Sequence, residues 1–453
     1  MTYILNFFNW IQSLGVSVFM PIVILIMGLI FGLGFSRSIK AGLTVGIGFI
    51  GLNLIINQLL GTSLSPAIQA MIEKYNLSLS VIDVGWPAAA AIALGSQIGV
   101  LIIPVGVLIN LIMLLTNTTQ TIDVDIWDYW HFAFTGALAA ILTGSFAIGM
   151  AMAIINMVII MVLADVTAEQ VEKSLGIPGV SLPHGFSTAY APIAMLFNWI
   201  IDRIPGLRDI DFNFDTLKEK LGILGEPMII GTVIGLVVGV VAGYDVAGIL
   251  VLGISLGAVL VLIPKMAAML MEGLEPISDS AGEFIKKRFS NRGKIYIGLD
   301  SAIGVGHPIT LTVAYILMPL TLILAIILPG NKVMPFAYLA VLPWMFVLIT
   351  PIVNNNGFRA LVIGFVVLIF GLYISTDLAP LITQAAINVG FEMPEGATMI
   401  SSICDGANPL TWVLVNINKL GMIGILVPAA VALVMALWNR NRIIKEARLE
   451  ANN

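Results

Sequence analysis

The residues best suited to chemistry are a few ionisable side chains that lie in or beside long apolar stretches. Carboxylates accept hydrogen bonds and a neutral imidazole both donates and accepts, so these groups suit the binding of a polar solute. Inside hydrocarbon they are costly and are functional candidates by default. The candidates are Asp83, His131, His184, Glu226, Asp300, His307 and Asp405.

His184 has the most unusual surroundings among these candidates. The stretch from Gly176 to Gly185 contains two prolines and three glycines, which disfavour a continuous helix. Non-helical backbone at membrane depth is tolerated only where it is buried in protein or lines a cavity. We therefore predict that His184, with Gly185 beside it, lines the path of the solute.

The acidic candidates have a second interpretation as helix caps, because a carboxylate at a helix N-terminus accepts backbone N–H bonds. For Asp83 the residues favour neither capping nor substrate contact. Asp300 is followed closely by His307, and this pairing favours substrate contact for both. Glu226 directly precedes a proline at the start of a predicted helix and is better explained as a cap.

Aromatic residues accompany two of the candidates. His131 follows the stretch 127–130, Trp-Asp-Tyr-Trp, which is also typical of an aromatic belt at a membrane interface. Trp86 lies close to Asp83 and could be another belt residue or a flat surface for the C–H face of a sugar. Both interpretations stay open for these residues.

The signatures of soluble enzymes do not occur. The sequence has no Walker phosphate loop, no zinc-ligand spacing and no nucleophile elbow. Cys404 is the only cysteine, and its apolar surroundings lack a basic residue that would favour a reactive thiolate. We expect no metal, no cofactor and no catalytic cysteine of the chain's own.

The elements that position these residues must be membrane helices. Of the 453 residues, 59% are hydrophobic and 10% are charged, whereas soluble domains carry about 25% charged residues. A membrane span needs about 20 apolar residues. The lipid bilayer is therefore the expected environment, and no nucleic-acid partner is expected.

The apolar runs predict an all-α polytopic protein with about eleven transmembrane helices. The third and the last run are long enough for a broken or re-entrant helix plus a full span. The runs are 14–35, 42–60, 84–115, 132–164, 181–201, 226–243, 246–271, 302–328, 336–353, 358–375 and 405–438.

Lysine and arginine in the loops predict the orientation, because they accumulate on the cytoplasmic side. They cluster in 203–220, in 286–294 and in the C-terminal tail, and they are absent from residues 1–36. The N-terminus is predicted outside and the C-terminus in the cytoplasm, which requires an odd number of spans. Two polar stretches, 203–226 and 272–294, are predicted as amphipathic helices on the cytoplasmic surface.

Two segments share a plan, with one acid, then glycine- and proline-rich backbone, then a long apolar run. One runs from Val81 to Pro104 and the other from Ile297 to Pro319. The loop charges place their starts on opposite sides, as inverted repeats with broken helices require. We predict a first repeat at 1–202, a cytoplasmic linker at 203–225, a second repeat at 226–420, and a last span with a cytoplasmic tail at 421–453.

Many short motifs, in order along nearly the whole chain, resemble one family. They include 83–87 (Asp-Val-Gly-Trp-Pro), 124–131 (Val-Asp-Ile-Trp-Asp-Tyr-Trp-His), 183–185 (Pro-His-Gly), 225–227 (Gly-Glu-Pro), 297–300 (Ile-Gly-Leu-Asp) and 328–331 (Leu-Pro-Gly-Asn). The family is the galactitol-type membrane component, IIC, of the bacterial phosphotransferase system, which is related to the ascorbate-type component.

The resemblance implies a homodimeric elevator-type carrier in the bacterial cytoplasmic membrane that translocates galactitol or a similar polyol. A separate cytoplasmic IIB protein, phosphorylated on a cysteine by a IIA protein, would phosphorylate the substrate. By resemblance, the substrate site comprises His131, Thr135, His184 and Asp300, with Asp83 and Trp86 close by. Asp300 or His184 could serve as a base towards the attacking hydroxyl.

Two other transport functions are compatible with the same residues. An ion-coupled secondary transporter would use the same broken helices and acids without a IIB partner, and an ascorbate-type permease would differ in substrate. A membrane-embedded enzyme is disfavoured by the missing motifs. A structural subunit is disfavoured by the many ionisable groups in apolar segments.

Overall fold

The structure, a computed structural model, describes residues 16–75, 79–125, 127–211, 226–289, 294–335, 337–339, 342–391, 393–394 and 397–451. The described residues are mostly helical, with a few short strands. Most of the predicted cytoplasmic linker, 212–225, lies outside them.

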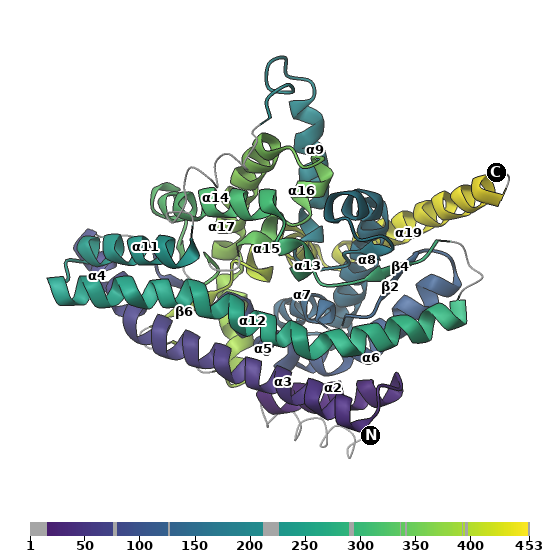
Figure 1. Ribbon diagram of the computed structural model, residues 1–453, viewed down its shortest axis with the longest axis horizontal. Helices are drawn as coiled ribbons and strands as arrows, with labels where there is room; N and C mark the ends of the chain where they lie inside the picture. The colour runs from purple at the N-terminus through teal and green to yellow at the C-terminus, as the bar shows by residue number, and fades with distance from the viewer. Residues whose placement is uncertain are drawn as a thin grey trace.

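An outer layer is formed by the first helices of each half of the chain. It comprises α2 (Val16–Ile30), α3 (Phe35–Leu54), the π-helix η1 (Ile55–Leu64), α4 (Ser65–Tyr75), α11 (Pro227–Ala242) and α12 (Val246–Phe289). In Figure 1, α12 runs across the molecule alongside α3 and α11, and it contacts both.

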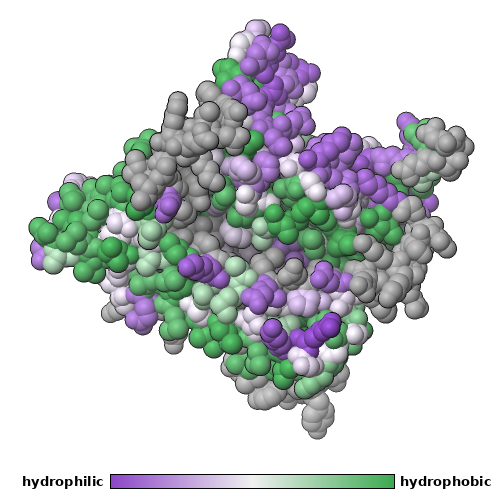
Figure 2. All heavy atoms as spheres, viewed as in Figure 1, coloured by the Kyte–Doolittle hydropathy of each residue, from purple (hydrophilic) through white to green (hydrophobic). Residues whose placement is uncertain are grey.

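The outer layer exposes apolar side chains, as a surface facing lipid or another apolar partner must. Leu43 and Ile47 on α3 and Val237 on α11 are exposed. Figure 2 shows hydrophobic residues over α11 and the start of α12, whereas hydrophilic residues gather at the tip that projects at the top, where residues 202–211 follow α9. This distribution fits a membrane-embedded body with a polar end.

The remaining helices form the core that carries the candidate residues. They are α5 (Gly85–Gly95), α6 (Gln97–Leu115), α7 (Asp128–Thr143), α8 (Phe146–Leu175), η2 (Thr188–Tyr190), α9 (Ala191–Ile201), α13 (Ala302–Val305), α14 (Pro308–Ile327), α15 (Pro343–Phe346), α16 (Ile349–Ile352), α17 (Gly357–Asn388), η5 (Asp405–Ala407), α18 (Pro409–Asn416), η6 (Ile417–Leu420) and α19 (Met422–Ala451).

Several predicted spans are broken in the structure. Within the described residues, five helices are long and apolar enough to cross a membrane: Gln97–Leu115, Phe146–Leu175, Pro308–Ile327, Gly357–Asn388 and Met422–Leu449. The run 84–115 splits at Ser96, whose hydroxyl caps α6 by accepting from the N–H of Gly99 at 3.0 Å. The chain is thus a helical membrane protein, and the total of eleven spans stays a prediction.

The predicted surface helix at 272–294 is not a separate element. Its residues up to Phe289 continue α12, which is one helix of 44 residues. Of the other predicted surface helix, 203–226, the described residues 203–210 form turns rather than a helix. Apolar and amphipathic sequence can share one helix, so a change of composition alone did not mark an end.

Two small parallel sheets tie the halves of the chain together. The strands are β1 (Val81–Asp83), β2 (Thr121–Asp123), β3 (Val180–Ser181), β4 (Tyr296–Gly298), β5 (Val333–Met334) and β6 (Met399–Ser401). The sheet orders are β5-β1-β6 and β2-β4-β3. In each sheet, one strand from one half pairs with two strands from the other half.

Asp83 fastens the loops that leave the first sheet. Its carboxylate accepts hydrogen bonds from the backbone N–H groups of Gly85 (3.1 Å), Ile403 (3.1 Å) and Tyr338 (2.8 Å). These residues follow β1, β6 and β5, so one buried carboxylate holds three chain segments. The local geometry also needs Gly85, whose φ of 73° is in the left-handed region.

We expect the substitution Asp83→Ala to lower the free energy of unfolding by about 2–5 kcal/mol, because it leaves buried N–H donors without an acceptor. Denaturation of the purified protein would measure this change. Asp245→Ala, which removes an exposed cap on α12, should cost only about 1 kcal/mol. Unchanged stability together with lost substrate binding would instead identify Asp83 as a substrate residue.

Candidate substrate site

Three buried side chains from distant parts of the sequence form a continuous hydrogen-bonded chain. Nε2 of His184 lies 3.1 Å from Nε2 of His131, and Nδ1 of His131 lies 2.5 Å from Oδ2 of Asp405. His131 is on α7, His184 follows β3, and Asp405 begins η5. These hydrogen bonds therefore join both halves of the protein within the buried core.

The partners of each ring nitrogen fix the positions of the protons. Nδ1 of His184 accepts from the backbone N–H of Ser187 at 3.1 Å, so the proton of this ring is on Nε2. That proton is donated to Nε2 of His131, which must then carry its own proton on Nδ1 and donate it to Asp405. Both imidazoles are neutral in this arrangement, and Asp405 is the anion at its end.

The loops around this chain are held by Asn408 and by the smallness of Gly185. The amide of Asn408 donates to the carbonyl of Gly185 at 2.9 Å and to Asp405 Oδ1 at 3.2 Å, and its oxygen caps α18. A Cβ at Gly185 would overlap the side chain of His131. Glycine is therefore required for the two loops to come this close.

Asp300 lies beside the imidazoles. Its Oδ2 is 3.6 Å from Nε2 of His184, and its Oδ1 accepts from the N–H of Ala302 at 2.6 Å. The carboxylate therefore both caps the turn after β4 and faces the histidine. The two alternatives weighed for this residue, capping and contact with the site, occur together.

Thr135 lies one turn after His131 on α7, but its hydroxyl bonds away from the imidazoles. It is 2.7 Å from the hydroxyl of Thr411 and accepts from the amide of Asn156 at 2.7 Å. Through these two hydrogen bonds, Thr135 joins α7 to α8 and α18.

Three tryptophans form an aromatic wall next to His131. The ring of Trp86 lies 6.1 Å from that of Trp127 and 6.5 Å from that of Trp130, and Trp130 is 4.1 Å from the imidazole of His131. Such a wall offers flat apolar surface beside polar groups. The stretch 127–130 is buried in the core rather than placed as an exposed aromatic belt.

Two predicted site residues lie apart from this group. Asp83 is occupied by the loops of the first sheet, as described above. His307 precedes α14, and among the described residues no hydrogen bond or ion pair joins its imidazole to the other predicted site residues.

Among the described residues, two clusters are close enough to offer ligands to a metal ion: Asp128–His131–His184 and His131–Cys404–Asp405. In both, the ring nitrogens of His131 are already used in direct hydrogen bonds. The arrangement is therefore a closed hydrogen-bond network, and a metal would have to break it.

Comparison with known proteins identifies the family. The sequence profile of the EIIC-GAT family, the sugar-specific permease component of the PTS system, matches residues 10–396. A protein of Escherichia coli K12 described as a permease IIC component is 40% identical over 97% of this chain and 100% of its own length. The galactitol-specific EIIC components of E. coli K12 and of E. coli O157:H7 are each 38% identical over 97% of this chain and 98% of their own length.

The chain belongs to the EIIC-GAT family. It is a sugar or polyol permease of the phosphotransferase system and a multi-pass membrane protein that works with IIA and IIB proteins. This membership confirms the resemblance seen in the sequence motifs and disfavours the ion-coupled secondary transporter.

The site of the permease contains further residues whose roles the sequence did not predict. Asp405 was one of several ionisable candidates in apolar runs, with no assigned role, and Asn408 and Asp128 were not among the candidates. Asp128 has a carboxylate oxygen within 4.8 Å of ring nitrogens of both His131 and His184. Its position three residues before His131 on a helix was the available signal, because such residues share a face.

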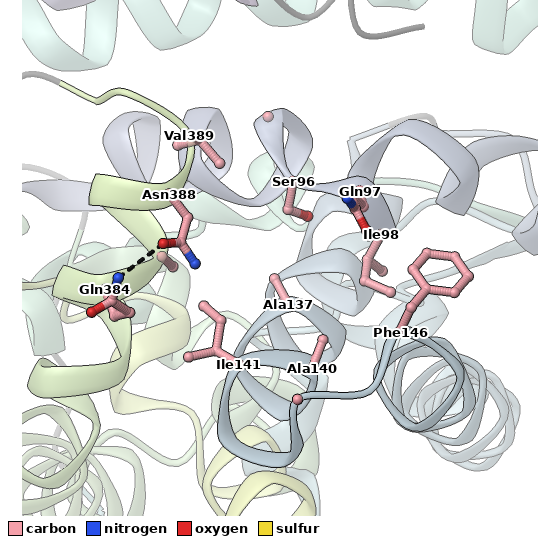
Figure 3. Close-up of a pocket in the computed structure, with 13 residues that line it drawn as sticks. Ser96, Gln97, Ile98, Ala137, Ala140, Ile141, Phe146, Gln384, Asn388 and Val389 are labelled. Atoms are coloured by element: carbon pink, nitrogen blue, oxygen red, sulfur yellow. Dashed lines mark hydrogen bonds between the residues drawn. The ribbon is translucent and has the colours of Figure 1, made fainter. Parts of the chain in front are cut away.

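A cavity of about 690 Å³ lies further along α7. Figure 3 shows Ser96, between α5 and α6, and the α17 residues Gln384 and Asn388 around this space, with Ala137 and Ala140 of α7 on its wall. From His131 to Ala137, the nearest α7 residue that lines the cavity, is about 9 Å along the helix at 1.5 Å per residue. The cavity is therefore separate from the imidazole chain, whose own side chains are packed against one another.

A double-mutant cycle should show strong coupling between His131 and Asp405. His131→Ala alone leaves a buried anion without its main donor, whereas the double variant with Asp405→Ala removes both groups. We expect a coupling energy of about 1–3 kcal/mol in the free energy of unfolding. The exposed pair Glu169–Lys173 (2.7 Å) is the control, with at most about 0.5 kcal/mol. Equal coupling in both pairs would contradict the proton arrangement given above.

Proposed function

We propose that this permease carries galactitol or a similar polyol and binds it between His131, His184 and Asp300. Galactitol-specific relatives, similar over nearly the full chain, support the polyol over an ascorbate-like substrate. The observation that best supports this site is the buried series of hydrogen bonds that links His184, His131 and Asp405.

The chemistry of these groups suits a chain of hydroxyls. A hydroxyl that enters between the two imidazoles can accept from Nε2–H of His184 and donate to Nε2 of His131, which replaces their mutual bond. The tryptophan wall offers a surface for the C–H face of the polyol. A substrate that lacks the matching hydroxyl would leave these buried groups unpaired, and this would provide specificity.

Asp300 is the better candidate for the base in phosphoryl transfer. The proposed step is attack of a substrate hydroxyl oxygen on the phosphorus of the phosphocysteine of IIB. The P–S bond breaks, the thiolate leaves, and the hydroxyl proton goes to Asp300. Nδ1 of His184 is already occupied by a backbone N–H, whereas Oδ2 of Asp300 faces the imidazoles beyond hydrogen-bonding distance of His184.

We further propose that the two halves, 1–202 and 226–420, are inverted repeats of an elevator-type homodimer. The strands β1, β2 and β3 start at residues 81, 121 and 180, and β4, β5 and β6 start at 296, 333 and 399. Each strand of the first half therefore precedes its counterpart in the second half by nearly the same number of residues. The sheet orders interchange under this correspondence. The outer layer, which contains the first helices of both halves, would be the scaffold and dimer surface, and the core would move.

We propose the orientation from the loop charges, with the N-terminus outside. Residues 203–225 would form the cytoplasmic linker, and residues 421–453 would form the last span and the cytoplasmic tail. Arg359 pairs with Asp202 at 2.6 Å and donates to the carbonyl of Arg208 at 2.9 Å, which gathers basic groups at one polar end. This end would face the cytoplasmic IIB protein.

Uptake of radiolabelled galactitol tests the function in cells that lack their own carrier. We expect accumulation as a phosphate ester only when IIA and IIB are also present. Asp300→Asn should reduce phosphorylated product at least 100-fold if it acts as the base, and Asp245→Asn, on an exposed cap, should have no effect. Accumulation of unmodified solute that collapses with the proton gradient would exclude the proposal.

Cross-linking tests the moving core. A disulfide between cysteines introduced on the contacting faces of α3 and α5 should abolish uptake, and reduction should restore it. The control is a cysteine pair at Gly51 and Met266, which are adjacent within the outer layer. Full uptake with the α3–α5 disulfide formed would argue against an elevator, because scaffold and core could not then move apart.

A further inference from the structure

Two aspartates beside the substrate site are buried without any donor to their carboxyl groups. Asp128 is fully buried and Asp123 is 5% exposed. Among the described residues, no N–H or O–H group forms a hydrogen bond with any of their four carboxyl oxygens. A carboxylate in this position loses its hydration without compensation, which is strongly unfavourable.

Other buried acids of the permease show the usual compensation. Asp83 accepts three backbone N–H bonds. Asp165 accepts from the hydroxyl of Thr121 at 2.7 Å, from the N–H of Gln120 at 3.0 Å and from the amide of Asn439 at 2.6 Å. The lack of donors at Asp123 and Asp128 is therefore specific to these two residues rather than general in this core.

The neighbours of the pair do not supply the missing donor. The hydroxyl of Tyr129 is bonded to the backbone carbonyl of Asp123 at 3.1 Å. The amide of Asn110 donates to the carbonyl of Thr121 at 3.0 Å, and its oxygen accepts the N–H of Asp123. These polar side chains form hydrogen bonds with backbone N–H and C=O groups around the two acids, and none of these bonds involves the carboxyl groups of Asp123 and Asp128.

The carboxyl groups of Asp123 and Asp128 lie within hydrogen-bonding reach of each other. Two carboxylates are both acceptors and repel each other, so a bond between them exists only if one carries a proton. The titratable groups around the pair add to the negative charge or are neutral: Asp125, Tyr129, His131, His184 and Asp300. Among the described residues, no lysine or arginine forms an ion pair with Asp123, Asp125 or Asp128.

We propose that Asp123 and Asp128 hold one shared proton at neutral pH and form a proton-binding site that adjoins the substrate site. The connection is Asp128, one of whose carboxylate oxygens lies within 4.8 Å of ring nitrogens of His131 and His184. A metal ion fits less well, because neither cluster of described residues with metal-ligand spacing includes Asp123.

The role of this proton rests on the proposed function. The phosphoryl group brought by IIB is negatively charged, and four ionised carboxyls at 123, 125, 128 and 300 would repel it. A proton held by the pair removes one of these charges without a positive side chain. It leaves Asp300 free to accept the proton of the substrate hydroxyl.

Infrared spectroscopy of the purified, full-length permease tests the proposal without substrate, IIA or IIB, so it does not depend on the transport assay. A protonated carboxyl has a C=O stretching band that a carboxylate lacks and that shifts in heavy water. We expect this band at neutral pH and expect its loss in Asp123→Asn and in Asp128→Asn, where the amide N–H replaces the shared proton. Asp165→Asn, at the buried acid that has its own donors, should retain the band.

Three results would overturn the proposal. The first is a wild-type spectrum without the band at neutral pH, which needs no variant to fold. The second is a band that persists in both folded variants. The third is a stoichiometric metal ion, found by elemental analysis of the wild-type protein and lost in Asp123→Asn.

Discussion

The hydrogen bond between His131 and Asp405 is the interaction on which the rest of the site depends. It joins residues 274 positions apart and ends a chain that begins at the backbone N–H of Ser187. Because each ring nitrogen has one partner, the chain fixes both tautomers and leaves a single anion at its end. The loops that carry these residues are held in turn by Asn408 and by Asp83, so the site has little freedom while the chain is intact.

Buried carboxylates organise this core in several ways. Asp83 and Asp165 gather backbone and amide donors and thereby hold the two small sheets. Asp405 is matched by the imidazole of His131, and Asp300 caps a turn while it faces the imidazole of His184. These arrangements offset the cost of burial with hydrogen-bond donors, and for Asp83, Asp165 and Asp405 the donors come from other segments. A membrane protein with few charged residues can thus use the same groups both to fix its fold and to form the polyol site proposed above.

The membrane class and the broken backbone at His184 followed from residue type. The motifs also grouped His131 with His184, and the structure places their imidazoles side by side. The length of the apolar runs did not predict their breaks, because Ser96 ends one helix and caps the next with no change in hydropathy. Neither did composition separate the amphipathic end of α12 from its apolar start. The roles of Asp405 and Asp128 depend on contacts across distant segments, which helix periodicity does not contain. Asp83 was left undecided because its partners, Tyr338 and Ile403, become neighbours only when the strands pair.

The most direct measurement is an experimental structure of the permease with galactitol bound. The account predicts that the polyol lies between His131, His184 and Asp300, with the bond between the two imidazoles replaced by bonds to a substrate hydroxyl and with the tryptophan wall along its C–H face. The account would be contradicted if galactitol were bound only in the cavity beside Ser96, Gln384 and Asn388 while the hydrogen bonds that link His184, His131 and Asp405 stayed intact.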